Sequence, residues 1–449
     1  MEERTYYNLT PSQDVSYLQC KYTLYKRVIN ILTSITFDEE IDFNLMQVAF
    51  NKMLERHDCL GIKFIKKKKM LMQYFGTAEK QEKIPVRKFK TEKEQEKFIE
   101  KVRRKPIKYL KGKLIEPYFI YTYDGKQMVF LKVCHLVLDI YGISVIFKDL
   151  IAIYSALKNN LAMPERPTKF EEVVKKDLER KNNKEYNDNN RQFFTKLLND
   201  NPEPYYAGLH GPNNEIWQKK LAKGNRGMQM FFVHNDTRDY CHKISAPIVE
   251  KVYHFCETNK CSPATFLLYT CTLTAGKINN NAQNLLPLAL YNCRSSALEK
   301  GCAGSKVQSV ACYTKFNYEK PFIENFNQFN AHQFTLCRHL GFPDRDFETL
   351  LHTTYRSSWL ETYYSLTLSF IPLELPDGIK IRIYSNQKCA LPAYIVQLLN
   401  PKTNEIDMFY DVQTKIISEK DVESFHEKYL SVINQVLENP EIKLSSLTV

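Results

Sequence analysis

Apolar patterns typical of strands and of amphipathic helices alternate along both halves of this chain, and this alternation constrains the fold more than any other feature. Residues 127–135, QMVFLKVCH, are apolar enough for a buried strand, and residues 143–157 place apolar side chains on one face of a helix. Residues 285–294 and 420–437 repeat the two patterns in the second half. Such alternation predicts an α/β or α+β fold built of layers.

The length of the chain predicts more than one folding unit. Its 449 residues correspond to two or three units at roughly 150 residues each. The composition changes near residue 176, where the charged, Asn-rich stretch KDLERKNNKEYNDNN begins and turn-like segments follow. We therefore expect an N-terminal lobe over 1–175 and a C-terminal lobe over 176–449.

Three further segments have readable local patterns. Residues 41–58 predict an amphipathic helix, and residues 262–276 predict a helix capped by Ser262 with a proline in its first turn. Residues 61–75 predict two strands joined by the turn Lys66–Lys69. Apolar strand residues flank this lysine run closely, so we interpret it as a solvated hairpin turn and not as a nucleic-acid site.

Composition excludes several classes of protein. Hydrophobic residues are 43% and charged residues 25%, as in ordinary globular proteins. The 12 cysteines lie at no CxxC spacing and no histidine cluster accompanies them, so we expect no metal site and a reducing, cytoplasmic environment. No signal peptide or membrane span is expected. The net charge of +12 fits either a lysine-rich surface or an acidic partner.

The segment Cys134–Asp139, CHLVLD, carries the most chemistry. It places His135 at a strand end and Asp139 four residues later, before a helix. A histidine whose pKa is near 6.5 can take a proton from an attacking amine or alcohol at neutral pH. An aspartate in this place can orient the imidazole directly, or it can hold the loop through a cation elsewhere. The spacing of His135 and Asp139 alone also fits a structural role, in which His135 is a hydrogen-bonded core residue and Asp139 caps the helix.

This segment resembles the HHxxxDG motif of the condensation-domain superfamily of acyltransferases, which have the chloramphenicol-acetyltransferase-like fold. Other matches follow in family order. They are Leu9-Thr10-Pro11-Ser12-Gln13 for the opening LTPxQ motif, Glu55-Arg56-His57-Asp58-Cys59-Leu60 with Phe64 for RHExLRTxF, Asp149-Leu150 on the following helix, Ser262-Pro263-Ala264-Thr265, the strand end Tyr291-Asn292-Cys293-Arg294, and the C-terminal helix with its tail.

The resemblance implies two similar α/β lobes in a V with a tunnel between them, and His135 within that tunnel. An acyl thioester on phosphopantetheine, carried by an acyl or peptidyl carrier protein or by coenzyme A, would enter from one side and the nucleophile from the other. The family's downstream arginine pairs with the motif aspartate, a role that the resemblance gives to Arg294. Asp139 and Arg294 would then brace the loop, while His135 would be catalytic.

Two positions depart from the family motif. Cys134 stands where the family has its first histidine. Adjacent strand residues point to opposite faces, so we expect Cys134 to be a small buried residue and not part of a dyad with His135. Ile140 stands where the family has glycine, and a β-branched residue resists backbone conformations open to glycine. Gly142, two residues later, is expected to compensate in part.

We therefore predict an acyltransferase that joins a thioester-bound acyl group to an amine acceptor, as in nonribosomal peptide synthesis. No adenylation or carrier segment follows in this sequence, so we expect a free-standing domain that meets its carrier protein in trans, with no tightly bound cofactor and no nucleic acid. The alternatives are an ester-forming O-acyltransferase with an alcohol acceptor and a non-catalytic, carrier-binding scaffold. The scaffold is motivated by the two departures from the motif.

Overall fold

The computed structural model describes residues 4–372 and 375–449, and the chain forms two compact units. Unit 1 comprises residues 1–183, 292–307 and 374–386, and unit 2 comprises 184–291, 308–373 and 387–449. This division differs from the expected boundary at 175/176. Two later segments return to unit 1, one carrying Arg294 and the other carrying a strand of its sheet. A composition change along the sequence cannot reveal such returns.

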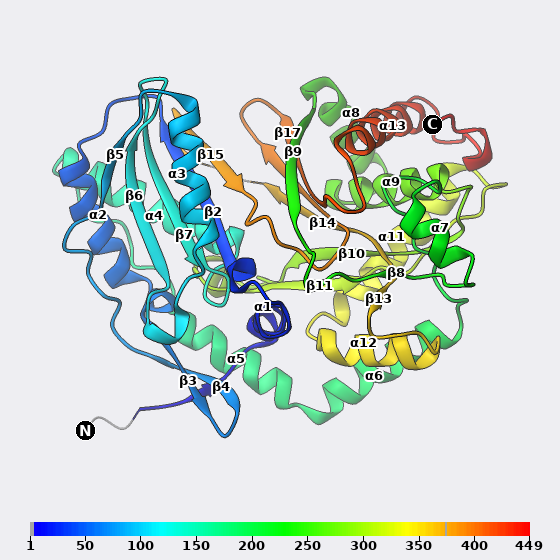
Figure 1. Cartoon of the computed structure of the whole chain (residues 1–449), viewed down its shortest axis with the longest axis horizontal. Coiled ribbons are helices and arrows are strands. Elements are labelled where there is room, and N and C mark those ends of the chain that lie inside the picture. Colours follow the sequence, from blue (N-terminus) through cyan, green and yellow to red (C-terminus); the bar gives the residue numbers. More distant parts are fainter. Residues whose placement is uncertain (1–3, 373–374) are drawn as a thin grey trace. The chain divides into compact units, whose positions relative to one another are not determined.

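Unit 1 is built on a five-stranded sheet in the order β15-β2-β7-β6-β5 (Figure 1). The central strand β7 (Gln127–Cys134) is buried at every position, and it pairs antiparallel with β2 (Asn30–Phe37) and β6 (Ile115–Tyr121). Side chains alternate between the two faces of this sheet. On one face, Val129 and Leu131 join the core that includes helices α2 and α4, whereas Phe130 joins a smaller core with α3.

The remaining elements of unit 1 include a small three-stranded sheet, β1-β4-β3. The bounds are β1 (Tyr7–Asn8), α1 (Pro11–Tyr22), α2 (Phe43–Arg56), β3 (Ile62–Lys67), β4 (Met70–Phe75), β5 (Val86–Lys88), α3 (Glu92–Arg104), α4 (Ile140–Lys158), α5 (Phe170–Asn182) and β15 (Ile379–Tyr384).

Unit 2 is built on a mixed sheet in the order β11-β10-β14-β16-β17-β9, with β12 paired to β10. Its parallel part, β10 (Asn284–Asn292), β14 (Tyr364–Pro372) and β16 (Ala393–Asn400), joins an antiparallel part made by β17 (Glu405–Gln413) and β9 (Thr237–Ile244). The helices α9 and α13 contribute apolar faces to the core of this unit.

The other elements of unit 2 are mostly helices. They are α6 (Lys184–Asn199), α7 (Glu215–Leu221), β8 (Met228–Gln229), α8 (Ala246–Thr258), α9 (Pro263–Ile278), β11 (Val307–Ala311), β12 (Thr314–Lys315), α11 (Phe322–Arg338), α12 (Asp344–Thr354), β13 (Glu361–Thr362) and α13 (Glu419–Glu438). The short helix α10 (Ala297–Lys300) belongs to unit 1.

The local expectations agree well with these elements. The expected helices over 41–58, 143–157, 262–276 and 420–437 correspond to α2, α4, α9 and α13. The lysine run is the turn of the β3–β4 hairpin, where Lys68 and Lys69 have positive φ, and Ser262 caps α9 by accepting a hydrogen bond from the Thr265 amide. The charged stretch after residue 176 is helical, in α5 and α6.

Helix α4 is apolar and long. Within the described residues it is the one helix that meets the length and hydropathy expected of a membrane span, and half of the relevant window is buried inside the fold. Its residues Ile143, Ile146, Phe147 and Leu150 are fully buried in the core of unit 1. The packing of α4 in this core accounts for its apolar composition.

Candidate active site

The candidate site lies where β7 ends and α4 begins, in unit 1. The His135 amide donates to the Ile29 carbonyl at 2.8 Å, which continues the pairing of β7 with the neighbouring chain segment. The amides of Val137 and Leu138 then turn back to the Cys134 carbonyl, at 3.0 and 3.3 Å. The loop is therefore a tight turn that leaves His135 at the strand end and starts α4 five residues later.

The His135 side chain is partly buried, and its imidazole is neutral at pH 7. Burial lowers its pKa below the ordinary 6.5, and nearby backbone groups together with the charge of Asp139 oppose this shift only in part. Its Nδ1 atom is buried and has no hydrogen-bond partner among the described residues. A neutral imidazole at pH 7 can accept a proton from an attacking nucleophile.

Asp139 does not act on His135 through a hydrogen bond. Its carboxylate caps α4 by accepting from the Gly142 amide at 2.7 Å, and it receives both guanidinium NH groups of Arg294 at 3.0 and 3.1 Å. The amides of Lys306 and Val307 donate to the same carboxylate at 2.7 and 2.9 Å. Asp139 therefore joins the start of α4 to the segment 292–307.

The ion pair between Asp139 and Arg294 that the family resemblance implied is present and buried, with side-chain exposures of 4% and 0%. Burial raises the pKa of the Asp139 carboxyl, but the charge and hydrogen bonds of Arg294 outweigh this effect and the pKa lies below its ordinary value. Arg294 also donates to the side chain of Asn292 and to the carbonyl of Gly304, and it lies over the ring of Tyr141.

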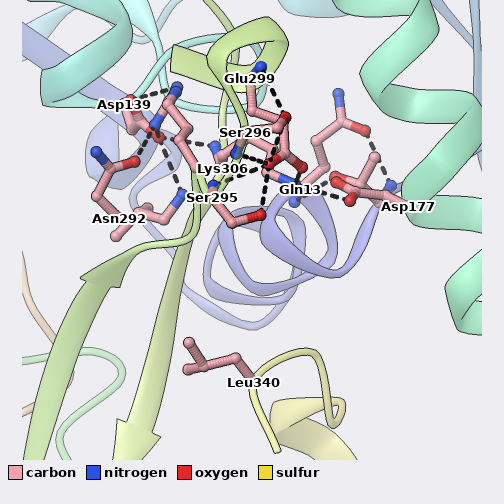
Figure 2. A network of polar contacts seen from close by, with 12 residues as sticks. Gln13, Asp139, Asp177, Asn292, Ser295, Ser296, Glu299, Lys306 and Leu340 are labelled. Carbon is pink, nitrogen blue, oxygen red and sulfur yellow. Dashed lines mark hydrogen bonds and ion pairs between the residues drawn. The ribbon is translucent and has the colours of Figure 1, made fainter. Parts of the chain in front are cut away.

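A second buried cation supports the same segment. The Lys306 ammonium donates to Asp177 on α5 at 2.8 Å and to Glu299 at 3.0 Å (Figure 2). Burial alone would raise the pKa of Glu299, but the backbone of Ser296 and the Lys306 ammonium lower it well below its ordinary value. Figure 2 shows Lys306 at the centre of this network, with Asp139 on one side and Asp177 on the other.

Gly142 has a steric role at the start of α4. A Cβ atom there would lie 2.8 Å from the Gly304 carbonyl oxygen, and one on Gly304 would lie 2.1 Å from the ring of Phe170. Both glycines therefore permit α4, the segment carrying Lys306 and the start of α5 to approach closely. This approach brings the Lys306 and Val307 amides to Asp139.

Gln13, the glutamine of the opening motif, holds the loop from its other side. Its side-chain amide donates to the Leu136 carbonyl at 3.0 Å and exchanges hydrogen bonds with Gln73 at 2.8 and 2.6 Å. Thr10 and Gln13 form a capping box at the start of α1. The chain's first helix is thus fixed directly to the loop that carries His135.

The Arg56-His57-Asp58 motif is structural. Arg56 makes a two-pronged contact with Asp149 of α4, at 2.9 and 3.0 Å, and His57 contacts the same carboxylate at 3.1 Å. Asp58 accepts from the Phe170 and Glu171 amides and so caps α5. These contacts fix the helices α4 and α5 that frame the site.

The two departures from the family motif have simple local environments. Cys134 is fully buried in the core, and burial raises the pKa of its thiol to about 12, so it is a neutral thiol at pH 7. Ile140 is the first residue of α4, and its side chain packs against the core. Its backbone does not have a positive φ. Here the backbone at position 140 does not require glycine.

Comparison with known proteins assigns the family. The family model described as "Condensation domain" matches residues 3–358. The chain therefore belongs to the condensation-domain family, whose members are acyltransferases that form amide bonds.

The fold agrees with this assignment. The starter condensation domain of rhizomide synthetase RzmA, solved as a variant in complex with C8-CoA, superposes with a TM-score of 0.82 at 12% identity, over 99% of this chain and 98% of that one. The first condensation domain of the calcium-dependent antibiotic synthetase, solved with a substrate analogue, gives a TM-score of 0.80 at 13% identity, over 100% and 99%. The expected α/β fold of the chloramphenicol-acetyltransferase-like class is confirmed.

Among curated proteins, a large plipastatin synthase polypeptide of Bacillus subtilis (strain 168) is 18% identical over 422 residues. The match covers 92% of this chain but 16% of that protein. This chain is thus similar to one part of a much longer synthase.

Sequence reasoning placed His135, Asp139, Arg294 and Gly142 in one local site, and the structure brings them together. It missed Lys306, Asp177 and Glu299, because a single lysine far from the motif gives no signal in one sequence. In the described ranges 4–372 and 375–449, no group of three or more His, Cys, Asp or Glu side chains is arranged to hold a metal ion.

Proposed function

We propose that this chain catalyses acyl transfer from a phosphopantetheine thioester to an amine acceptor, with His135 as the catalytic residue. The observation that carries the proposal is the state of His135. It is a neutral, partly buried imidazole on a loop fixed by Asp139 and Gln13. The thioester is carried by an acyl or peptidyl carrier protein or by coenzyme A.

In the proposed reaction the amine nitrogen attacks the thioester carbonyl carbon. The C–N bond forms, the C–S bond breaks, and the thiol of phosphopantetheine leaves. His135 takes or positions the proton that the amine loses, and this proton is returned to the departing thiolate. No metal ion is required for this balance.

Asp139 and Arg294 are positioning residues in this proposal. Every oxygen of the Asp139 carboxylate already accepts hydrogen bonds from Arg294 and backbone amides, and its lowered pKa keeps it ionised. It is therefore a poor proton acceptor at neutral pH. Its contribution is to hold the start of α4, and hence the His135 loop, in place.

The similar proteins support the choice of donor and bond. The RzmA starter condensation domain was solved with C8-CoA, which is an acyl thioester. The similar curated protein is named as a synthase of plipastatin. An amine acceptor follows the amide-forming chemistry of the family. Ester formation with an alcohol acceptor uses the same proton transfer and remains the alternative bond.

The test is product formation measured by mass spectrometry. Wild type, His135→Ala and the exposed-histidine control His254→Ala would each receive acyl-CoA or acyl-loaded carrier protein with a mixed pool of amines and alcohols. We expect amides from wild type and from the control, and a loss of about 100-fold or more in His135→Ala. Circular dichroism would establish that all three are folded.

Other outcomes separate the alternatives. Esters in place of amides would establish the O-acyltransferase. Equal product from wild type and His135→Ala would remove His135 from the chemistry. Carrier binding without product from any acceptor would favour the non-catalytic scaffold.

A further inference from the structure

Two cysteines of unit 2 lie together in the turn between α8 and α9 (Figure 1). Cys256 is in the last turn of α8, and Cys261 comes directly before Ser262, the residue that caps α9. Both cysteines are free, and a hydrogen bond joins their two thiols. The acyl-transfer reaction proposed for His135 uses neither of them.

The backbone of this turn brings the two residues together. The Cys261 amide donates to the Cys256 carbonyl at 3.0 Å. The Lys260 amide donates to the Glu257 carbonyl at 3.4 Å, and Lys260 has a left-handed backbone with a φ of 50°. These features define a Schellman motif, in which the side chains of the first and last residues commonly make contact. In this turn those two residues are the cysteines.

The same backbone hydrogen bond keeps the pair within reach of a disulfide. With standard bond lengths, an N···O distance of 3.0 Å holds the Cα atoms of Cys256 and Cys261 no more than about 7 Å apart. Disulfides join Cα atoms that are about 4.4–6.8 Å apart. The hydrogen bond between the thiols shows that the side chains point toward each other. Small rotations of the side chains therefore suffice to form the S–S bond.

The two thiols differ in their access to solvent. Cys256 is 3% exposed and belongs to the hydrophobic core of unit 2, whereas Cys261 is partly exposed. A reagent in solution therefore reaches Cys261 first. Cys256 is placed to react with its neighbour and not with the reagent.

The hydrogen bond also makes Cys261 the better nucleophile. The Cys256 thiol donates to Cys261, which lowers the pKa of Cys261 and raises the pKa of Cys256. At Cys293 and Cys389, which are also partly exposed, burial raises the pKa to about 12. Since the thiolate is the reactive form of cysteine, Cys261 should react faster than these two residues.

We propose that Cys256 and Cys261 are a redox-sensitive modification site, at which a small-molecule disulfide such as oxidised glutathione generates a reversible protein disulfide. The Cys261 thiolate attacks one sulfur of the small disulfide and displaces one small thiolate. The Cys256 sulfur then attacks Cys261 in the mixed disulfide and displaces the second. The two cysteines lose two electrons and two protons, and the small disulfide takes them up as two thiols.

The disulfide would join the end of α8 covalently to the start of α9. In the reduced protein this connection is held by hydrogen bonds of the turn and by the Ser262 cap, which accepts from the Thr265 amide at 3.1 Å. The site lies within unit 2, and its chemistry does not involve His135. It can therefore fail while the proposed acyl transfer holds, and the reverse is also true.

The test treats the full chain at pH 7 with oxidised glutathione, blocks free thiols with iodoacetamide and digests the product with trypsin. Cleavage after Lys260 separates the cysteines into the peptides 252–260 and 261–277. Mass spectrometry should find these peptides cross-linked, with fragmentation assigning the bond to Cys261 and not to the buried Cys271. We expect about tenfold more cross-linked peptide than glutathione adduct at Cys261, because the second thiol is already in place.

Three variants test the order of the two steps. Cys256→Ala removes the second thiol and should stop the reaction at the mixed disulfide of Cys261 with glutathione. Cys261→Ser should leave Cys256 unmodified, because that thiol is buried. Cys241→Ser, the control at an exposed cysteine outside this turn, should form as much cross-linked peptide as wild type. Circular dichroism would establish that all variants are folded.

Two results with wild type would overturn the proposal. One is a glutathione adduct at Cys261 without the cross-linked peptide. The other is an unmodified pair under conditions in which the exposed Cys241 reacts, since the two thiols would then be only a packing contact of the turn. The wild-type result decides the question even if a variant does not fold.

Discussion

Asp139 in unit 1 is buried and Asp344 in unit 2 is partly exposed, and the pKa values of the two carboxyls are shifted in opposite directions. Asp139 accepts hydrogen bonds from Arg294, Gly142, Lys306 and Val307, and its pKa lies below the ordinary value. Asp344 accepts from the Ser309 hydroxyl and faces another carboxyl, and its pKa is raised to about 7. Burial is the largest single effect on both groups.

The donors around a carboxyl, and not only its depth, therefore decide its role. A carboxylate that accepts hydrogen bonds from a guanidinium and three amides stays ionised, and its lone pairs are all engaged. We call such a group a structural joint, because it holds separate chain segments together. A carboxyl with one hydroxyl donor and a second carboxyl beside it can gain or lose a proton near neutral pH. Substitutions that change these donors should affect the two groups differently, and the greatest change is expected at Arg294.

Arg294→Ala should have the largest effect, because it makes Asp139 resemble Asp344. Removing one partner of a buried ion pair leaves an uncompensated charge and costs about 3–5 kcal/mol of unfolding free energy at pH 7. Product formation should fall with it, since the His135 loop loses its support. Urea unfolding monitored by circular dichroism measures the change.

The control and the pH dependence make this prediction sharper. Lys196→Ala removes an exposed ion pair with Asp200 and should leave stability unchanged. The folded pKa of Asp139 is depressed, so its stabilising contribution is present above about pH 4 and is lost as the pH falls through the folded value. Arg294→Ala should weaken this acid dependence, and an unaltered acid profile would contradict the assignment of Asp139 as the joint.

The joint around Asp139 was only partly predictable from the sequence. Asp139 and Arg294 are 155 positions apart, and their pairing came from the family motif and not from any local pattern. Lys306 and its partners carry no motif, because burial of a lysine is decided by packing between distant segments. The helices were predictable because their apolar spacing is local, as in α2 and α4.

Asp344 shows the same limit in the second unit. The stretch PDRDFETLLH reads as an ordinary helix start, with acidic residues that favour the helix dipole. Nothing in that pattern distinguishes Asp344, which accepts from Ser309, from Asp346, which pairs with Arg191. Only the neighbouring strand and loop, brought in from elsewhere in the sequence, create the difference.

Gly304→Ala should have the next largest effect. Its new Cβ would meet the Phe170 ring at 2.1 Å, so the segment 302–306 must shift, at a cost of about 1–3 kcal/mol. The shift would move the Lys306 amide away from Asp139 and reduce product formation. Gly76→Ala is the control for replacing a glycine at an uncrowded place, because its φ is not positive and no atom lies closer than 3.4 Å to its Cβ position.

A crystal structure of Gly304→Ala would show whether the displacement reaches Asp139. A variant as stable and active as wild type would mean that Phe170 yields without moving the segment. The steric argument for Gly142 and Gly304 would then be wrong.

Asp344→Asn should stabilise the protein, in contrast to changes at Asp139. The folded pKa is raised, so the ionised group opposes folding; this penalty is absent below the unfolded value near 4 and grows until about pH 7. We expect a gain of about 1–2 kcal/mol at pH 8, after allowance for solvent screening, and almost none at pH 4. Thermal unfolding at both pH values measures it, and a pH-independent gain would exclude the titration of Asp344 as its cause.

Ile140→Gly, which restores the family residue, should have the smallest effect. Ile140 is helical and packs against the core, so glycine loses apolar contact and gains backbone freedom without relieving any strain. We expect a loss of about 1 kcal/mol or less and unchanged kcat for product formation. If Ile140→Gly instead raises kcat several-fold, the side chain at this position obstructs substrate, and the donors of Asp139 alone do not determine how well the loop works.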